Sequence, residues 1–100
     1  MVETDFTDDV LTAKLYGEID HHRAPAIRTK IDGQTESLRP KELRLDFSHV
    51  SFMDSSGIGL IMGRYHQVSL VGGKLKVVNV PKGIEKIINL SGIESLGVLR

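Results

Sequence analysis

The sequence predicts a single α/β domain in which helices pack on a mixed sheet of four to five strands. Strand-like and helix-like hydrophobic patterns follow one another along the chain in the order β-β-α-β-α-β-α-β. This alternation favours parallel neighbouring strands that are joined by helices. The first two strands are separated only by a turn signal, so they add an antiparallel pair. A length of 100 residues suits one domain, and we assign residues 1–100 to it.

The first two strands are expected to form a hairpin. Residues 2–6 read as a short strand, and residues 7–9, Thr-Asp-Asp, are a turn signal. In residues 10–16 apolar and polar side chains alternate, which predicts a half-buried strand. Gly17 is expected to end it.

A helix and a third strand follow. Asp20 is a typical cap residue, and an imperfect apolar stripe predicts a helix over residues 21–38. Pro25 falls in the first turn, where proline is tolerated. Residues 43–47 alternate between apolar and charged side chains and predict a strand. Residues 48–53 are expected to be a connector.

The second half of the chain predicts two more helices. A helix over residues 55–70 is closed by Gly72-Gly73, and an apolar strand covers residues 75–80. Another helix opens at Pro81, and residues 95–99 are expected to form a last short strand. The apolar residues expected on one side of this later helix are Ile84, Ile87, Ile88 and Leu90.

Composition excludes several classes of protein. Lysine plus arginine and aspartate plus glutamate each number 13, so the formal net charge is zero. A zero balance without a basic cluster argues against a nucleic-acid or anionic-membrane binder. There is no cysteine, hence no disulfide or thiol chemistry. The start resembles no secretory signal, and no apolar run could span a bilayer. We therefore expect a cytoplasmic protein without a cofactor.

Three cap-type residues, Asp54, Ser55 and Ser56, stand together at the start of the helix over residues 55–70. One side chain is enough to cap the free N–H groups there. The remaining hydroxyl would lie at a helix N-terminus, which favours phosphate. This predicts a phosphate acceptor. Simple capping is the alternative, and a nucleophilic serine is a weaker one, because no G-x-S-x-G motif frames it.

The same helix contains Gly57, Gly59 and Gly63, although glycine in a helix interior costs about 1 kcal/mol relative to alanine. At 100° per residue, Gly59 and Gly63 align with each other near Leu60. We expect this side to be a surface that another backbone approaches. The alternative is tight packing within the domain. The face expected to be buried comprises Ile58, Ile61, Met62, Tyr65 and Val68.

Other constellations carry weaker signals. Gly57-Ile58-Gly59 lacks the third glycine of a dinucleotide fingerprint. His21 and His22 are expected to point apart, and no histidine has metal-ligand spacing, so no metal site is predicted. Asp46 and Asp54 suggest a phospho-accepting aspartate, but the acidic pair of receiver domains is missing.

Two stretches of the sequence resemble segments of a known family. The stretch Phe52-Met53-Asp54-Ser55-Ser56-Gly57-Ile58-Gly59, followed by Gly63-Arg64-Tyr65, resembles the signature of the anti-sigma-factor antagonists, a STAS-domain family. The segment from Gly17 to His22, Gly-Glu-Ile-Asp-His-His, resembles the family's turn after its second strand. The Asp-His-His triplet is most similar to the sporulation branch, which relieves inhibition of the forespore sigma factor.

The resemblance implies a mechanism. The unphosphorylated antagonist binds an anti-sigma-factor serine kinase, with nucleotide bound to the kinase, and the sigma factor is released. The kinase then phosphorylates the antagonist, and a metal-dependent serine phosphatase reverses this. The family's phosphorylated serine falls on Ser55, and the domain itself is no enzyme. The residues to which the resemblance and the helix geometry assign partner binding are Asp20, His21, Asp54, Ser56, Gly57, Gly59, Leu60 and Gly63.

Two further functions stay open from the sequence. A STAS-domain sensor that binds a small ligand or nucleotide would need a concave pocket beside Ser55. A small hydrolase using Ser55 would need a general base, and none stands at a recognisable spacing.

Overall fold

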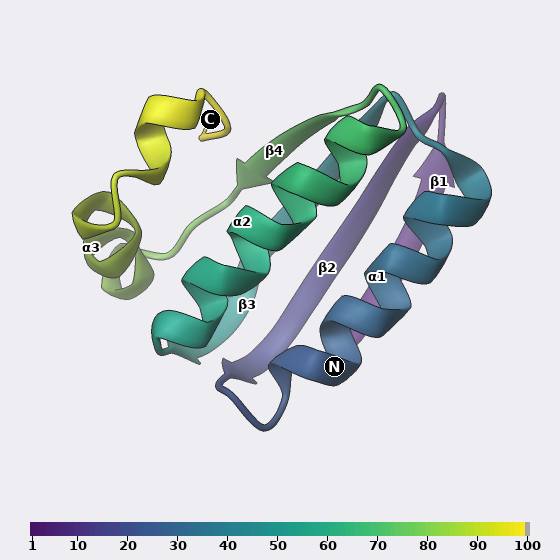
Figure 1. The fold of residues 1–100 in the computed structure, drawn as a ribbon. Helices are drawn as coiled ribbons and strands as arrows, with labels where there is room; N and C mark the ends of the chain where they lie inside the picture. The colour runs from purple at the N-terminus through teal and green to yellow at the C-terminus, as the bar shows by residue number, and fades with distance from the viewer. Residues whose placement is uncertain (100) are drawn as a thin grey trace.

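The structure is a computed structural model that describes residues 1–99, and its centre is a four-stranded mixed sheet (Figure 1). The strands β1 (Val2–Thr7), β2 (Val10–Ile19), β3 (Glu42–Met53) and β4 (Lys74–Val78) lie in that order. β1 pairs with β2 antiparallel, whereas β3 is parallel to both β2 and β4. The predicted α/β class, mixed sheet and N-terminal hairpin are therefore confirmed.

β2 and β3 are both longer than the sequence predicted. Gly17 does not end β2 but lies at a register shift with a φ of 81°, and the strand continues to Ile19. Residues 48–53, expected as a connector, are the second half of β3. They remain extended because they pair in parallel with the continuation of β2, and this pairing satisfies backbone hydrogen-bonding groups of both strands.

Two helices, α1 (Ala24–Leu38) and α2 (Ser55–Leu70), lie side by side on one face of the sheet (Figure 1). α1 begins at Ala24, later than the predicted residue 21. The Asp20 carboxylate accepts hydrogen bonds from the N–H groups of His22 and Arg23, both at 3.0 Å. Asp20 therefore holds the turn that precedes the helix and does not cap the helix itself.

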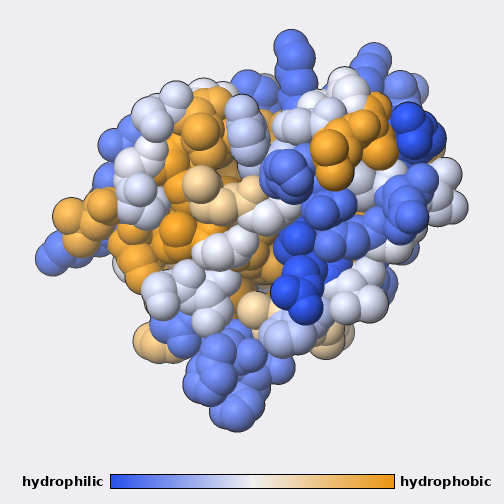
Figure 2. Space-filling view, in the orientation of Figure 1, coloured by the Kyte–Doolittle hydropathy of each residue, from blue (hydrophilic) through white to orange (hydrophobic). Residues whose placement is uncertain are grey.

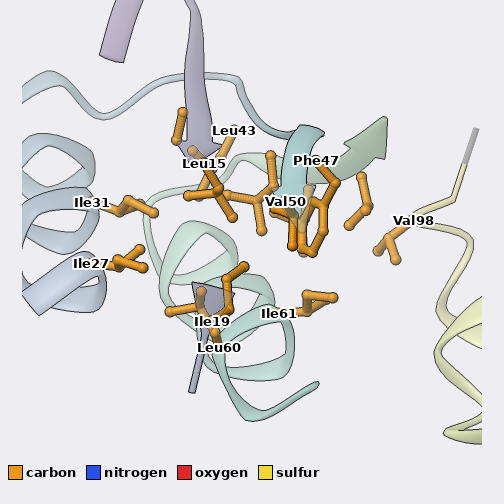
Figure 3. Packing of buried hydrophobic residues seen from close by; sticks show 14 of the residues in the cluster. Leu15, Ile19, Ile27, Ile31, Leu43, Phe47, Val50, Leu60, Ile61 and Val98 are labelled. Carbon is orange, nitrogen blue, oxygen red and sulfur yellow. The ribbon is translucent and has the colours of Figure 1, made fainter. Parts of the chain in front are cut away.

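The hydrophobic core fills the layer between the sheet and these two helices (Figure 3). Alternate side chains of β2 and β3 point into it, as the sequence pattern predicted, and each helix contributes one stripe. Fully buried members include Leu11, Leu15, Ile19, Ile31, Leu43, Leu45, Phe47, Ile61 and Val77. The intervening residues Lys14, Arg44 and Lys76 belong to the opposite, polar face of the sheet.

The C-terminal part lies beside the β4 side of the sheet (Figure 1) and contains α3 (Lys82–Leu90) and a 3-10 helix, η1 (Ile93–Leu96). The predicted strand over residues 95–99 is wrong, because Gly92 and Gly97 adopt positive φ on either side of η1. What remains of it is a parallel bridge between Val77 and Leu99. Leu90, expected on the buried side of α3, is 80% exposed.

No helix within residues 1–99 combines the length and the apolar character that a bilayer span requires.

Candidate partner-docking site

The N-terminus of α2 lies beside the end of β2. Ile19 and Met53 are paired across the parallel strands β2 and β3, and the N–H of Asp54 donates to the Ile19 carbonyl at 3.2 Å. The segments that follow, Asp20-His21 and Asp54-Ser55-Ser56, therefore leave the sheet at the same edge. The sequence assigned both segments to one site, and the fold brings them together.

One of the three cap-type residues does the capping. Asp54 has an extended backbone, and its carboxylate accepts a hydrogen bond from the Ser56 N–H at 2.8 Å. Ser55, the first residue of α2, is exposed, and Ser56 is half-buried. Within residues 1–99 neither serine hydroxyl makes a hydrogen bond. The site thus offers hydroxyls that capping does not use, and that of Ser55 is the more accessible.

The buried face of α2 differs from the predicted one. The prediction included Met62, which is 46% exposed, and left out Leu60, which is 4% exposed. α2 is covered on two sides, by the sheet and by α1, so its buried arc turns toward α1. Leu60 is therefore mostly buried, although the prediction placed it with the glycines on an open surface. The residues buried on this arc are Gly57, Leu60, Ile61, Arg64 and Val68.

The glycines of α2 have different surroundings. A Cβ atom on Gly57 would lie only 2.1 Å from Cγ of Met53, so Gly57 lets α2 start close to the end of β3. A Cβ atom on Gly59 or Gly63 would meet no described atom within 4 Å. Tight packing within the domain, the alternative explanation for Gly59 and Gly63, is therefore wrong for both; it is Gly57 that packs tightly.

A hollow of about 360 Å³ opens between α1 and α2. We call it the interhelix hollow. Asp20 and Asp54 do not line it, but hold the turns from which the two helices start. Gly57, in the first turn of α2, is buried. The lining residues are His21, Ala24, Pro25, Arg28, Ser56, Gly59, Leu60, Gly63 and Arg64, among them five that the sequence assigned to partner binding.

The chain is similar to known proteins over nearly its whole length. The family model described as STAS domain matches residues 1–98. The chain belongs to the STAS domain family. An anti-sigma F factor antagonist from Paenibacillus polymyxa is 32% identical to this STAS domain over 92 residues, which are 92% of this chain and 79% of the relative. An anti-sigma-B factor antagonist from Bacillus subtilis (strain 168) is 28% identical over 95% of this chain and 85% of that protein.

Solved structures of anti-sigma factor antagonists share the fold of this STAS domain. The antagonist SpoIIAA in its unphosphorylated form has a TM-score of 0.87 at 29% identity, covering 100% of this chain and 86% of that chain. The Bacillus cell fate determinant SpoIIAA in its phosphorylated form has a TM-score of 0.78, also at 29% identity, covering 100% and 89%. The predicted membership in the anti-sigma-factor-antagonist family is confirmed.

The turn before α1 places a charged group at the edge of the STAS domain's interhelix hollow. The pKa of Asp20 is lowered, chiefly because the N–H of Arg23 donates to its carboxylate; the Arg23 guanidinium and the N–H of His22 act in the same direction.

The side chains of His21 and His22 were expected to point apart, and this expectation is wrong. Their ring centroids lie 4.1 Å apart. Within residues 1–99 no group of three histidine or acidic side chains could hold a metal ion.

Sequence reasoning missed the ion pair beneath the hollow. Nε of Arg64 on α2 lies 2.7 Å from Oδ1 of Asp32 on α1. Burial is the leading cause of both shifts: it lowers the pKa of Arg64 and raises that of Asp32, in each case against the attraction between the two charges. The helical spacing of Arg64 from Gly57 and Leu60 is the signal that could have placed it on the buried arc.

The glycines give a test of the helix start. Gly57→Ala is expected to lower the free energy of unfolding by about 1–3 kcal/mol, because the new methyl group displaces the buried Met53 side chain. Gly59→Ala, the matched control, is expected to raise it by up to about 1 kcal/mol through helix propensity. Urea denaturation measures both. Equal effects of the two substitutions would contradict the assigned roles.

Proposed function

We propose that this STAS domain is an anti-sigma-factor antagonist that works as a phosphorylation-controlled binding module and not as an enzyme. Its unphosphorylated form binds an anti-sigma-factor serine kinase, with nucleotide bound to the kinase, and so releases a sigma factor. Phosphorylation of Ser55 by that kinase ends the interaction, and a metal-dependent serine phosphatase restores it. The system operates in the cytoplasm, without nucleic acid or membrane as a partner of this domain.

The observation that carries the proposal is the exposed Ser55 at the start of α2, the helix in which no atom of residues 1–99 covers the backbone at Gly59 and Gly63. A kinase active site must reach the hydroxyl oxygen closely, and the open backbone at Gly59 and Gly63 leaves room for it. Two further findings support the proposal. The relatives are anti-sigma factor antagonists, and one of them, SpoIIAA, has a phosphorylated form.

Ser55 is a better acceptor than Ser56 on geometric grounds. The N–H of Ser56 is held by the Asp54 carboxylate, and its side chain lines the interhelix hollow, where it is half-buried. Ser55 is exposed and its hydroxyl is free within residues 1–99. Phosphate on Ser55 would also lie at a helix N-terminus, which favours negative charge.

The test is incubation of the chain with the anti-sigma kinases of its source organism and ATP, followed by mass spectrometry of residues 54–64. We expect one phosphate, on Ser55. Ser55→Ala should abolish phosphorylation and keep kinase binding, whereas the matched control Ser56→Ala should still be phosphorylated. If Ser56→Ala blocks phosphorylation and Ser55→Ala does not, the acceptor is Ser56. If no kinase binds the chain, the proposed function is wrong.

The open glycines are proposed to contact the kinase, which Gly63→Gln tests. The glutamine side chain enters open space in the free domain, so the melting temperature should stay the same or rise. In the complex it blocks the approach of the partner, and affinity measured by calorimetry should fall at least about tenfold, roughly 1.4 kcal/mol. Unchanged affinity would remove Gly63 from the docking site.

A further inference from the structure

We propose that the interhelix hollow receives an acidic side chain of the partner, with the carboxylate bound by Arg64 and Arg28. The proposal rests on the proposed function for the identity of the partner, an anti-sigma kinase. Its chemistry rests on the residues of this chain alone. It concerns a binding subsite next to Ser55 and not the phosphorylated serine itself.

The first observation is the state of Arg64. This residue is 3% exposed, yet it lines the hollow. A guanidinium group carries five N–H donors in a fixed plane. One contact is present, to Oδ1 of Asp32 at 2.7 Å, but it is too poorly aligned to count as a hydrogen bond. Within residues 1–99 the buried Nε atom therefore has no hydrogen-bond partner, which is unusual for a buried polar atom.

The second observation is the charge of the lining. Arg28 and Arg64 both line the hollow, with His21 at its edge, and the lining contains no acidic residue. Asp32, which contacts Arg64, is not part of the lining. Figure 2 shows strongly hydrophilic atoms along the seam between the two helices, beside paler and apolar atoms. Asp32 supplies one negative charge to these two arginines, so the seam favours a further anionic group from outside.

The shape of the hollow favours a carboxylate on an aliphatic stem. Leu60 lies among the lining residues with Ala24 and Pro25, and these apolar groups can contact the methylene groups of a glutamate. Gly59 and Gly63 have no side chain that would hold the partner backbone away. Ser56 lines the hollow and Ser55 precedes it, so a phosphate on Ser55 would repel a carboxylate bound there.

The first experiment measures the affinity of the unphosphorylated chain for its nucleotide-bound kinase. Arg28→Glu should weaken binding by about 10- to 100-fold or more, because a charge-assisted hydrogen bond is replaced by repulsion. Lys74→Glu is the matched control: it makes the same charge change on an exposed residue at the start of β4, and its effect should be small. Replacing the contacting acidic residue of the kinase by lysine should restore binding to Arg28→Glu.

Equal affinities of Arg28→Glu and Lys74→Glu, with wild type binding normally, would overturn the subsite and leave the proposed function intact. An effect of Arg28→Glu that disappears when the kinase is nucleotide-free would also overturn it, and would assign the seam to a nucleotide phosphate.

A second experiment needs no kinase and therefore separates the two proposals. N-acetylglutamate amide, titrated in the millimolar range, should shift the amide signals of Gly59 and Gly63 and the Nε signal of Arg64. N-acetylglutamine amide should not; equal shifts with both compounds would overturn the subsite.

Discussion

Phosphorylation of Ser55 is expected to weaken kinase binding by two to three decades or more while the domain keeps its stability. In the free domain the phosphate lies at the N-terminus of α2, where a negative group typically stabilises a helix by about 0.3–1 kcal/mol. In the complex the same group, with roughly −1.5 to −2 charges, is desolvated without a partner of its own. Burying an unpaired charge costs about 3–5 kcal/mol, at 1.4 kcal/mol per decade of affinity.

The measurement is a pair of quantities for both forms: the dissociation constant for the kinase, and the melting temperature with backbone amide NMR shifts. The phosphorylated domain should melt no lower, with shift changes confined to residues near Ser55. Shifts that spread to the distant hairpin over residues 2–16, or a melting temperature lower by many degrees, would contradict a local mechanism. Ser55→Ala treated in the same way is the control for the kinase reaction.

Asp32→Asn is expected to lower the free energy of unfolding by about 3 kcal/mol. The substitution leaves the nearly fully buried Arg64 guanidinium without its counter-charge, and breaking a buried pair in this way costs about 3–5 kcal/mol. We place the effect at the lower end because the Asp32 side chain is 28% exposed. Arg64→Met should cost less, since the partly exposed carboxylate that remains can be hydrated.

The double variant Asp32→Leu/Arg64→Met gives the sharper comparison. Burial outweighs attraction in the pKa of both groups, so the pair contributes little beyond an apolar pair of similar size. The double variant should therefore be more stable than Asp32→Asn, and urea denaturation at neutral pH measures the difference. Asp5→Asn, at an exposed position on β1, is the control and should be within about 0.5 kcal/mol of wild type. A similarly small effect of Asp32→Asn would mean that Arg64 finds other partners.

Local patterns predicted the elements that depend on near neighbours in the chain. The hairpin is an example: Asp8 and Asp9 both adopt positive φ, which a tight turn between right-twisted strands requires and aspartate tolerates. The three cap-type residues at the start of α2 are another, because capping is decided within one helical turn. The alternation in β2 also gave the correct buried face.

Features that depend on distant partners were beyond the sequence pattern. Helical periodicity places residues around α2 but does not show that α1 covers one of its sides. For this reason Met62 was predicted to be buried and Leu60 to be exposed, whereas the structure has the reverse. The second half of β3, residues 48–53, lacks the apolar-polar alternation of a strand and is extended because it pairs with β2, which continues past Gly17. Arg64 reads as a surface residue until the carboxylate of Asp32, on another helix, is placed beside it.

The parallel pairing of β2 with β3 also has a consequence for folding. Asp20 and Asp54 come together only through the contact between Ile19 and Met53, which closes a loop containing the whole of α1. Contacts between residues so far apart in the chain carry a large entropic cost of loop closure, and they form later than a local hairpin such as β1–β2. A partly folded chain that has the hairpin but lacks this closure has no docking site. The proposed docking surface is thus available only on molecules that have formed these long-range contacts.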